Sequence, residues 1–110
     1  MDTDALMHDL IVDRLKAKFA SQYKEITVNA GNPDMSLGNH GMTVACVQVE
    51  TERSITSEQA AKWKEMIADC PRLILMVPKQ SKVKVMELLW SQGIAGRVGV
   101  GSYEILITMP

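Results

Sequence analysis

The sequence predicts an α/β fold: a single domain, residues 1–110, with a central mixed sheet flanked by helices. The chain has 110 residues, which suits one domain, and it contains no repeat or linker. Segments with helical spacing of apolar residues alternate with short apolar segments bounded by Gly and Pro. Hydrophobic residues make up 46% of the chain and aromatic residues 5%, so the core must be mainly aliphatic.

The first two elements follow from apolar spacing. Residues 4–23 should form an amphipathic helix, because apolar residues recur every three to five positions among charged ones, and Asp4 is a suitable cap. Residues 24–30 then read as a short strand, which the run Gly31, Asn32 and Pro33 ends. Asp34 begins the next extended segment.

A β-hairpin is predicted from residues 35–37 and 42–50. The intervening residues 38–41 include two glycines and an asparagine, which tolerate positive φ. The second arm is apolar on both faces over its first two-thirds, which is typical of a central strand buried on both sides. A four-residue turn would bring Asp34 toward residues 43–45.

The second half of the chain predicts two more helix and strand pairs. A helix capped by Ser54 or Thr56 should run to about Asp69, followed by a strand over residues 72–78. Residues 79–92 form the next helix, which Gly93 ends, and residues 97–108 form a final strand or two. The glycines at positions 99 and 101 indicate a bulge or bend there. The expected order is therefore α, β, β, β, α, β, α, β.

Composition limits the function classes. The formal net charge is −1, so the molecule has no overall basic field for nucleic acid or anionic lipid. Cys46 and Cys70 lie in apolar surroundings without a CxxC motif, and we interpret them as buried free thiols. His8 and His40 do not form a paired zinc motif. No apolar run approaches the roughly 20 residues that span a bilayer. These features predict a cytoplasmic protein with no membrane partner.

A polar cluster is expected where the central strand ends. Gln48 and Glu50 lie on one face of that strand, about 7 Å apart, because side chains alternate along a strand. Asp34 follows an irregular turn on the neighbouring segment. Each residue also has a simpler explanation: Asp34 can be a turn residue, and Gln48 and Glu50 can mark a strand that emerges into solvent.

The combination of Pro33-Asp34, a hairpin, a strand ending in Gln48-Val49-Glu50 and a following helix resembles the PD-(D/E)xK nuclease superfamily. The resemblance implies a restriction-endonuclease-like αβββαβ core over residues 4–78, with an appended αβ. The strand end and the sequence KWK at residues 62–64 also look like a group of small prokaryotic nuclease-like domains.

The resemblance further implies a Mg²⁺ or Mn²⁺ ion held by Asp34 and Glu50. Asp34 matches the motif Asp, whereas Gln48 stands at the position of the motif Asp or Glu and Glu50 at that of its Lys. Neutral Gln48 removes one negative charge, which should weaken metal binding. The missing lysine would be replaced from the following helix, and the candidates are Gln59, on the flank nearer the sheet, and Lys62.

Two functional hypotheses follow. The first is a metal-dependent nuclease that hydrolyses DNA, with Asp34, Gln48, Glu50, Gln59 and Lys62 as site residues. The alternative is a catalytically inactive nuclease-fold module for binding or assembly, or a subunit that needs a partner chain. The apolar segment 103–109 would be either an inner strand or an edge covered by a second subunit, and we expect a homodimer.

Overall fold

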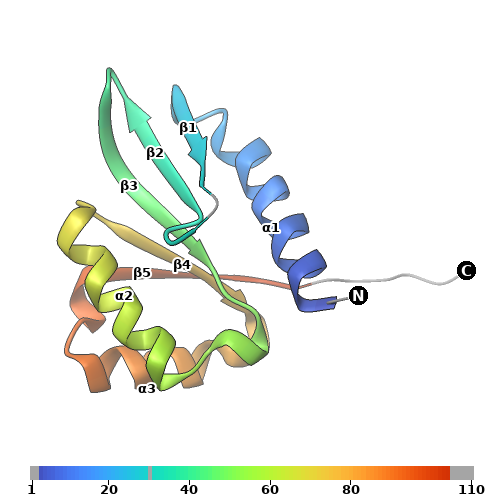
Figure 1. Ribbon diagram of the computed structural model, residues 1–110, viewed down its shortest axis with the longest axis vertical. Coiled ribbons are helices and arrows are strands. Elements are labelled where there is room, and N and C mark those ends of the chain that lie inside the picture. Colours follow the sequence, from blue (N-terminus) through green and yellow to red (C-terminus); the bar gives the residue numbers. More distant parts are fainter. Residues whose placement is uncertain (1–2, 30, 105–110) are drawn as a thin grey trace, which may run out of the picture.

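A computed structural model describes residues 3–29 and 31–104, and its elements follow the expected order (Figure 1). Three short 3₁₀ segments join them. The elements are α1 (Thr3–Phe19), β1 (Glu25–Val28), β2 (Met35–Asn39), β3 (Met42–Val49), η1 (Glu52–Ser54), α2 (Ser57–Asp69), β4 (Leu73–Pro78), η2 (Lys79–Ser81), α3 (Lys82–Gln92), η3 (Ala95–Arg97) and β5 (Val98–Tyr103).

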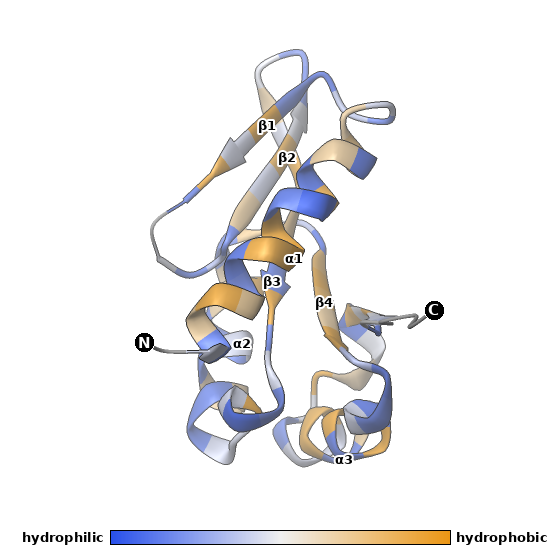
Figure 2. Ribbon diagram, turned by 90° about the vertical axis from the view of Figure 1, so that its right-hand side faces the viewer, coloured by the Kyte–Doolittle hydropathy of each residue, from blue (hydrophilic) through white to orange (hydrophobic). Residues whose placement is uncertain are grey.

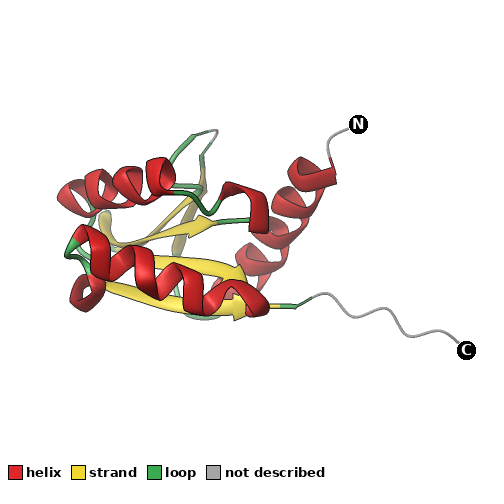
Figure 3. Ribbon diagram, turned by 90° about the horizontal axis from the view of Figure 1, so that it is seen from below, coloured by secondary structure: helices red, strands yellow, loops and turns green. Residues whose placement is uncertain are grey.

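The five strands form one mixed sheet in the order β1-β2-β3-β4-β5. The first three strands are an antiparallel meander, and β4 and β5 run parallel to β3. Helix α1 covers one face of the sheet, and α2 and α3 cover the other (Figure 3). The predicted α/β class, with a mixed sheet between helices, is confirmed.

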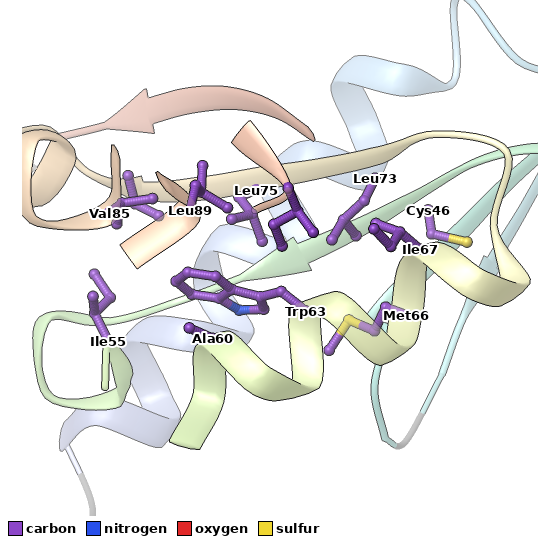
Figure 4. Packing of buried hydrophobic residues seen from close by; sticks show 12 residues of the cluster. Cys46, Ile55, Ala60, Trp63, Met66, Ile67, Leu73, Leu75, Val85 and Leu89 are labelled. Atoms are coloured by element: carbon purple, nitrogen blue, oxygen red, sulfur yellow. The ribbon is translucent and has the colours of Figure 1, made fainter. Parts of the chain in front are cut away.

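Each face of the sheet has its own apolar core. On one side, Ile11, Val12 and Leu15 of α1 pack against the meander. On the other, Trp63 of α2 is fully buried and lies over β3 and β4 beside side chains from α3 (Figure 4). In Figure 2, β4 is orange along its length and α1 alternates between orange and blue, as expected for a buried strand and an amphipathic helix.

The hairpin register differs from the predicted one. The turn is only two residues, His40 and Gly41, which both adopt positive φ (55° and 77°) between the paired residues Asn39 and Met42. A bulge after Leu37 then shifts the register further. As a result Met35 pairs with Val47, and Asp34 lies beside the end of β3 instead of residues 43–45.

The burial of β3 differs from the prediction at both ends of the strand. Met42, Thr43 and Val44 are exposed, whereas the strand is buried from Ala45 to Val49. The reason is that β4 pairs with β3 only from Cys46 onward, so the hairpin tip projects beyond the neighbouring strand (Figure 1). The polar residues at the end of β3 therefore lie in the buried part of the strand.

The interpretation of the cysteines as free thiols was wrong. Cys46 in β3 and Cys70 at the C-terminus of α2 form a disulfide, with their Cα atoms 6.1 Å apart. Helix α2 packs on the face of β3 to which Cys46 points, so residues distant in sequence meet. Free thiols were one reason to expect a cytoplasmic protein, because disulfides are rare in the reducing cytosol. The cytoplasmic location stays a prediction, without this reason.

Smaller differences concern the first helix and the last strand. Helix α1 ends at Phe19, four residues earlier than expected. Of the bulge or bend expected in the last strand, the bulge is wrong, because β5 keeps a regular parallel register with β4 through Gly99 and Gly101. Strand β5 is an edge strand that ends at Tyr103, and the rest of the predicted strand, residues 105–108, lies outside the described residues. Across residues 3–29 and 31–104, no helix combines the length and apolarity needed to cross a membrane.

Candidate functional site

Asp34 is placed immediately before β2 and is 7% exposed. Its Oδ2 accepts a hydrogen bond from the backbone N–H of Val49 at 2.7 Å. Its own N–H donates to Oε1 of Gln48 at 3.1 Å. The side chain of Asp34 thus satisfies a backbone donor at the end of β3, just before the first residue of β2, and it is held against the central strand.

Glu50 follows β3 directly and is 1% exposed. Its Oε1 accepts from Nε2 of Gln48 at 2.8 Å and from Nε2 of Gln59 at 2.9 Å, while Oε2 accepts from Oγ of Ser54 at 3.0 Å. Its backbone N–H donates to the carbonyl oxygen of Met76 at 2.9 Å. The carboxylate is therefore buried and oriented by three neutral side-chain donors.

Gln48 links the two carboxylate residues. Its Oε1 faces the N–H of Asp34, and its Nε2 donates both to Glu50 and to Oδ1 of Asn32 at 2.7 Å. The orientation of this amide is determined, because turning it over would set NH₂ against a backbone N–H and an oxygen against two acceptors. At 3% exposure, Gln48 is the buried centre of the cluster.

His8 of α1 forms the other side of the site. Its Nε2 lies 2.9 Å from Oδ1 of Asp34 and its Nδ1 lies 3.2 Å from Oδ1 of Asp9. Partial burial lowers the pKa of His8, but the hydrogen bonds to Asp34 and Asp9 and the charges of these carboxylates outweigh burial, so the pKa is raised. When the ring is protonated, it donates from both nitrogens and partly balances the charge of Asp34.

Glu50 has no such cation within the described part of the chain. Burial raises its pKa, and the nearby charge of Asp34 raises it further, while the hydrogen bonds from Gln48, Gln59 and Ser54 act in the opposite direction. Across the described residues, Glu50 takes part in no ion pair. Among the described residues, the site thus holds two carboxyl groups and one basic side chain, His8, which pairs with Asp34 and not with Glu50.

Tyr103 at the end of β5 anchors the backbone of Glu50. Its hydroxyl donates to the carbonyl oxygen of Glu50 at 2.7 Å. Burial, followed by the charges of Asp4 and Glu50, raises the pKa of Tyr103 to about 12, which keeps the hydroxyl protonated as a donor. The site therefore draws on α1, β2, β3, η1, α2 and β5.

The cluster opens into a shallow cavity of about 270 Å³. Asp34, Gln48, Glu50 and Gln59 line it, together with His8 and Ser54 among other residues. A second cavity of about 320 Å³ lies between α1 and β1, and His8 and Asp34 line both. These cavities lie against the polar cluster, in which Glu50 and Gln48 are themselves only 1% and 3% exposed.

Four of the five predicted site residues meet in this network, namely Asp34, Gln48, Glu50 and Gln59. Lys62 does not: it is exposed on α2 and does not line the cavity, because it lies on the opposite side of the helix from the buried Trp63 stripe. No group of three or more His, Cys, Asp or Glu side chains within the described ranges is arranged to hold a metal ion.

Sequence reasoning missed His8, Asn32, Ser54 and Tyr103. Ser54 was considered only as a cap, and in the structure Thr56 caps α2 by accepting from the N–H of Gln59. A signal for His8 was present, because it precedes the buried Val12 by one helical turn and so faces the sheet.

Comparison of this chain with family models, curated proteins and solved structures finds no match.

Proposed function

We propose that this domain is a nuclease-like phosphodiesterase that acts on DNA, with Asp34 and Glu50 as ligands of a divalent cation, Mg²⁺ or Mn²⁺. One observation carries the proposal. Glu50 is a nearly completely buried carboxyl group that shares a network with Asp34 and has no cationic partner among the described residues. A buried carboxylate is costly without a positive charge, and a cation would supply that charge.

The donor set suits a hard cation. Asp34 and Glu50 offer carboxylate oxygens, which Mg²⁺ and Mn²⁺ prefer, and Mg²⁺ commonly binds through one or two carboxylates plus water and substrate phosphate. Oε2 of Glu50 accepts one hydrogen bond and keeps a second lone pair, whereas Oε1 of Glu50 already accepts two, so a cation would bind at Oε2 or displace the amide of Gln48 or Gln59. When bound, such an ion activates water and stabilises charge on the phosphate undergoing attack.

The chain's own residues would orient this pair of ligands. Gln48 connects Asp34 to Glu50 through its amide, while Gln59 and Ser54 fix the carboxylate of Glu50 from the side of α2. In this arrangement Gln48 is a positioning residue, because its nitrogen, which cannot ligate a cation, faces Glu50. Lys62 could contact a bound nucleic acid only from outside the site.

The arrangement of the elements supports the nuclease-like assignment. A helix, an antiparallel three-stranded meander, a second helix on the opposite face and a strand parallel to β3 give the αβββαβ order that the resemblance implies for residues 4–78. The motif residues stand at the start of β2 and at the end of β3, where that fold would require them.

A second candidate function is a non-catalytic module with the same fold. It is favoured by the fact that all four oxygens of Asp34 and Glu50 have donor groups within hydrogen-bonding distance. An amide NH₂ also occupies the place where a third carboxylate is expected. In such a module the network would only stabilise the junction of α1, β3 and α2.

Metal titration followed by calorimetry distinguishes the two candidates. The variant is Asp34→Asn with Glu50→Gln, and the matched control is Glu65→Gln with Asp69→Asn, which makes the same charge changes at exposed positions of α2. The nuclease proposal predicts one Mn²⁺ site in the wild type and the control, weakened at least tenfold in the variant. Binding that is equal in all three proteins would support the non-catalytic module.

Cleavage is then tested on plasmid, single-stranded and branched DNA with Mg²⁺ and Mn²⁺. The wild type should cut at least one substrate, and Asp34→Ala should remove the activity. The same background in the wild type and in Asp34→Ala would refute the catalytic claim. Melting temperatures of all variants establish that the compared proteins are folded.

A further inference from the structure

Helix α3 carries an exposed apolar stripe that no described element covers. Val83, Met86 and Trp90 are 73%, 38% and 73% exposed. Their spacing of three and four residues places them on one side of the helix, whereas Val85 and Leu89 point into the core. Figure 1 shows α3 at the lower edge of the molecule, with no described element beyond it.

The stripe is unusual in its chemistry as well as in its exposure. Scattered exposed apolar residues are common, but three on one helix face that include a tryptophan are typical of a contact surface. Trp90 contrasts with Trp63, which is fully buried in the same domain. A side chain as large and apolar as that of Trp90 gains most from being covered by a partner.

We propose that this stripe is a homodimer interface, in which α3 of a second copy packs antiparallel across it. In a two-fold symmetric pair centred near Met86, Trp90 packs on Val83 of the partner subunit, and Val83 packs on Trp90 of the partner subunit. Met86 lies at the axis. The stripe is therefore complementary to itself, as an isologous interface requires.

The charges beside the stripe select a second copy as the occupant. Lys84 and Glu87 lie one turn apart on the same flank, and within the described part of the chain neither forms an ion pair. Antiparallel packing reverses their order across the axis. Lys84 then comes level with Glu87 of the partner subunit, and Glu87 with Lys84 of the partner subunit. A net charge of −1 gives little repulsion between copies.

The interface is expected to be weak. Helix α3 has 11 residues and is about 16 Å long, so a pair of such helices buries less than the roughly 1,600 Å² of a standard interface. We expect a dissociation constant in the range of tens of micromolar. This surface is separate from the Asp34 and Glu50 site, so the proposal does not depend on nuclease activity.

Sedimentation velocity of the full chain, from micromolar to several hundred micromolar, tests the dimer. The wild type should change from monomer to dimer, and Trp90→Ser should raise the dissociation constant at least tenfold. Tryptophan emission should shift to shorter wavelength as the dimer forms, because Trp90 leaves water while Trp63 stays buried. A dimer that persists in Trp90→Ser would place the interface elsewhere, for example at the edge strand β5, and would overturn the proposal.

Charge reversal identifies the partner. Lys84→Glu should weaken the dimer about tenfold, because it sets like charges against each other twice per dimer. Adding Glu87→Lys should restore the affinity, and Lys64→Glu on the exposed side of α2 is the control with the same charge change. A double variant as weak as Lys84→Glu would contradict the antiparallel pair. A wild type that is monomeric throughout would also overturn the proposal, in favour of another partner or of a segment of the same chain.

Discussion

The substitution Gln48→Glu would restore the acidic residue of the nuclease motif, and we expect it to destabilise the protein. In the structure Nε2 of Gln48 donates to Oδ1 of Asn32 at 2.7 Å and to Oε1 of Glu50 at 2.8 Å. A carboxylate in this place would lose both hydrogen bonds and face two acceptors, one of them charged. Loss of these bonds together with the buried like charge should cost about 3–5 kcal/mol.

The cost should depend on pH. Two facing carboxyl groups in a buried site raise the pKa of at least one of them above its value in the unfolded chain. The folded state then binds more protons than the unfolded state, so stability is greatest at low pH and is lost as the pH rises through the raised pKa. The difference between the wild type and the Gln48→Glu variant should accordingly be largest near pH 8 and shrink toward pH 5.

Urea unfolding at pH 5 and pH 8, followed by circular dichroism, measures this difference. The matched control is Gln48→Met, which removes the same hydrogen bonds without adding a charge and should vary less with pH. If Asp34 and Glu50 bind a cation, millimolar Mn²⁺ should restore the Gln48→Glu variant more than the control. A variant as stable as Gln48→Met at pH 8, or one whose deficit is the same at pH 5, would refute the reasoning.

Three further predictions concern the surroundings of the site. Burial raises the pKa of Glu50, so the contribution of Glu50 to the free energy of unfolding falls as the pH rises above about 4.5. Glu50→Gln should therefore flatten the pH dependence of this free energy, measured by urea unfolding. A pH dependence equal to that of the wild type would contradict a raised pKa of Glu50. Tyr103→Phe should lower the free energy of unfolding by about 1 kcal/mol, because the hydrogen bond to the carbonyl oxygen of Glu50 is lost. The loss should be the same from pH 6 to 9, since the hydroxyl of Tyr103 stays protonated there, and thermal melts at these pH values measure it. Replacing Cys46 and Cys70 by Ala should lower the free energy of unfolding by about 3–4 kcal/mol, as expected for a disulfide that closes a loop of this length, and adding a thiol reductant to the wild type should have the same effect.

The sequence by itself determined the order and type of the elements. Helical and strand periodicities follow from which residues can face a core, and turns follow from residues such as Gly41 and Gly93 that tolerate positive φ. Caps are equally local, as Thr56 shows at the start of α2. The strand pattern also singled out Gln48 and Glu50, which lie on one face at the end of a buried strand, and the resemblance to the nuclease motif added Asp34.

Only the tertiary structure decided which residues contact this polar cluster and which residue pairs with Cys46. A two-residue turn and one bulge set the hairpin register, and a shift of one residue along a strand changes which side chains meet. His8 and Tyr103 reach the site from α1 and β5, and Cys46 of β3 meets Cys70 because the end of α2 packs on the same face of the sheet. Such contacts depend on how helices pack on the sheet, which local periodicity does not specify. The sequence therefore determines which residues need partners, and the packing of distant elements determines which partners they find.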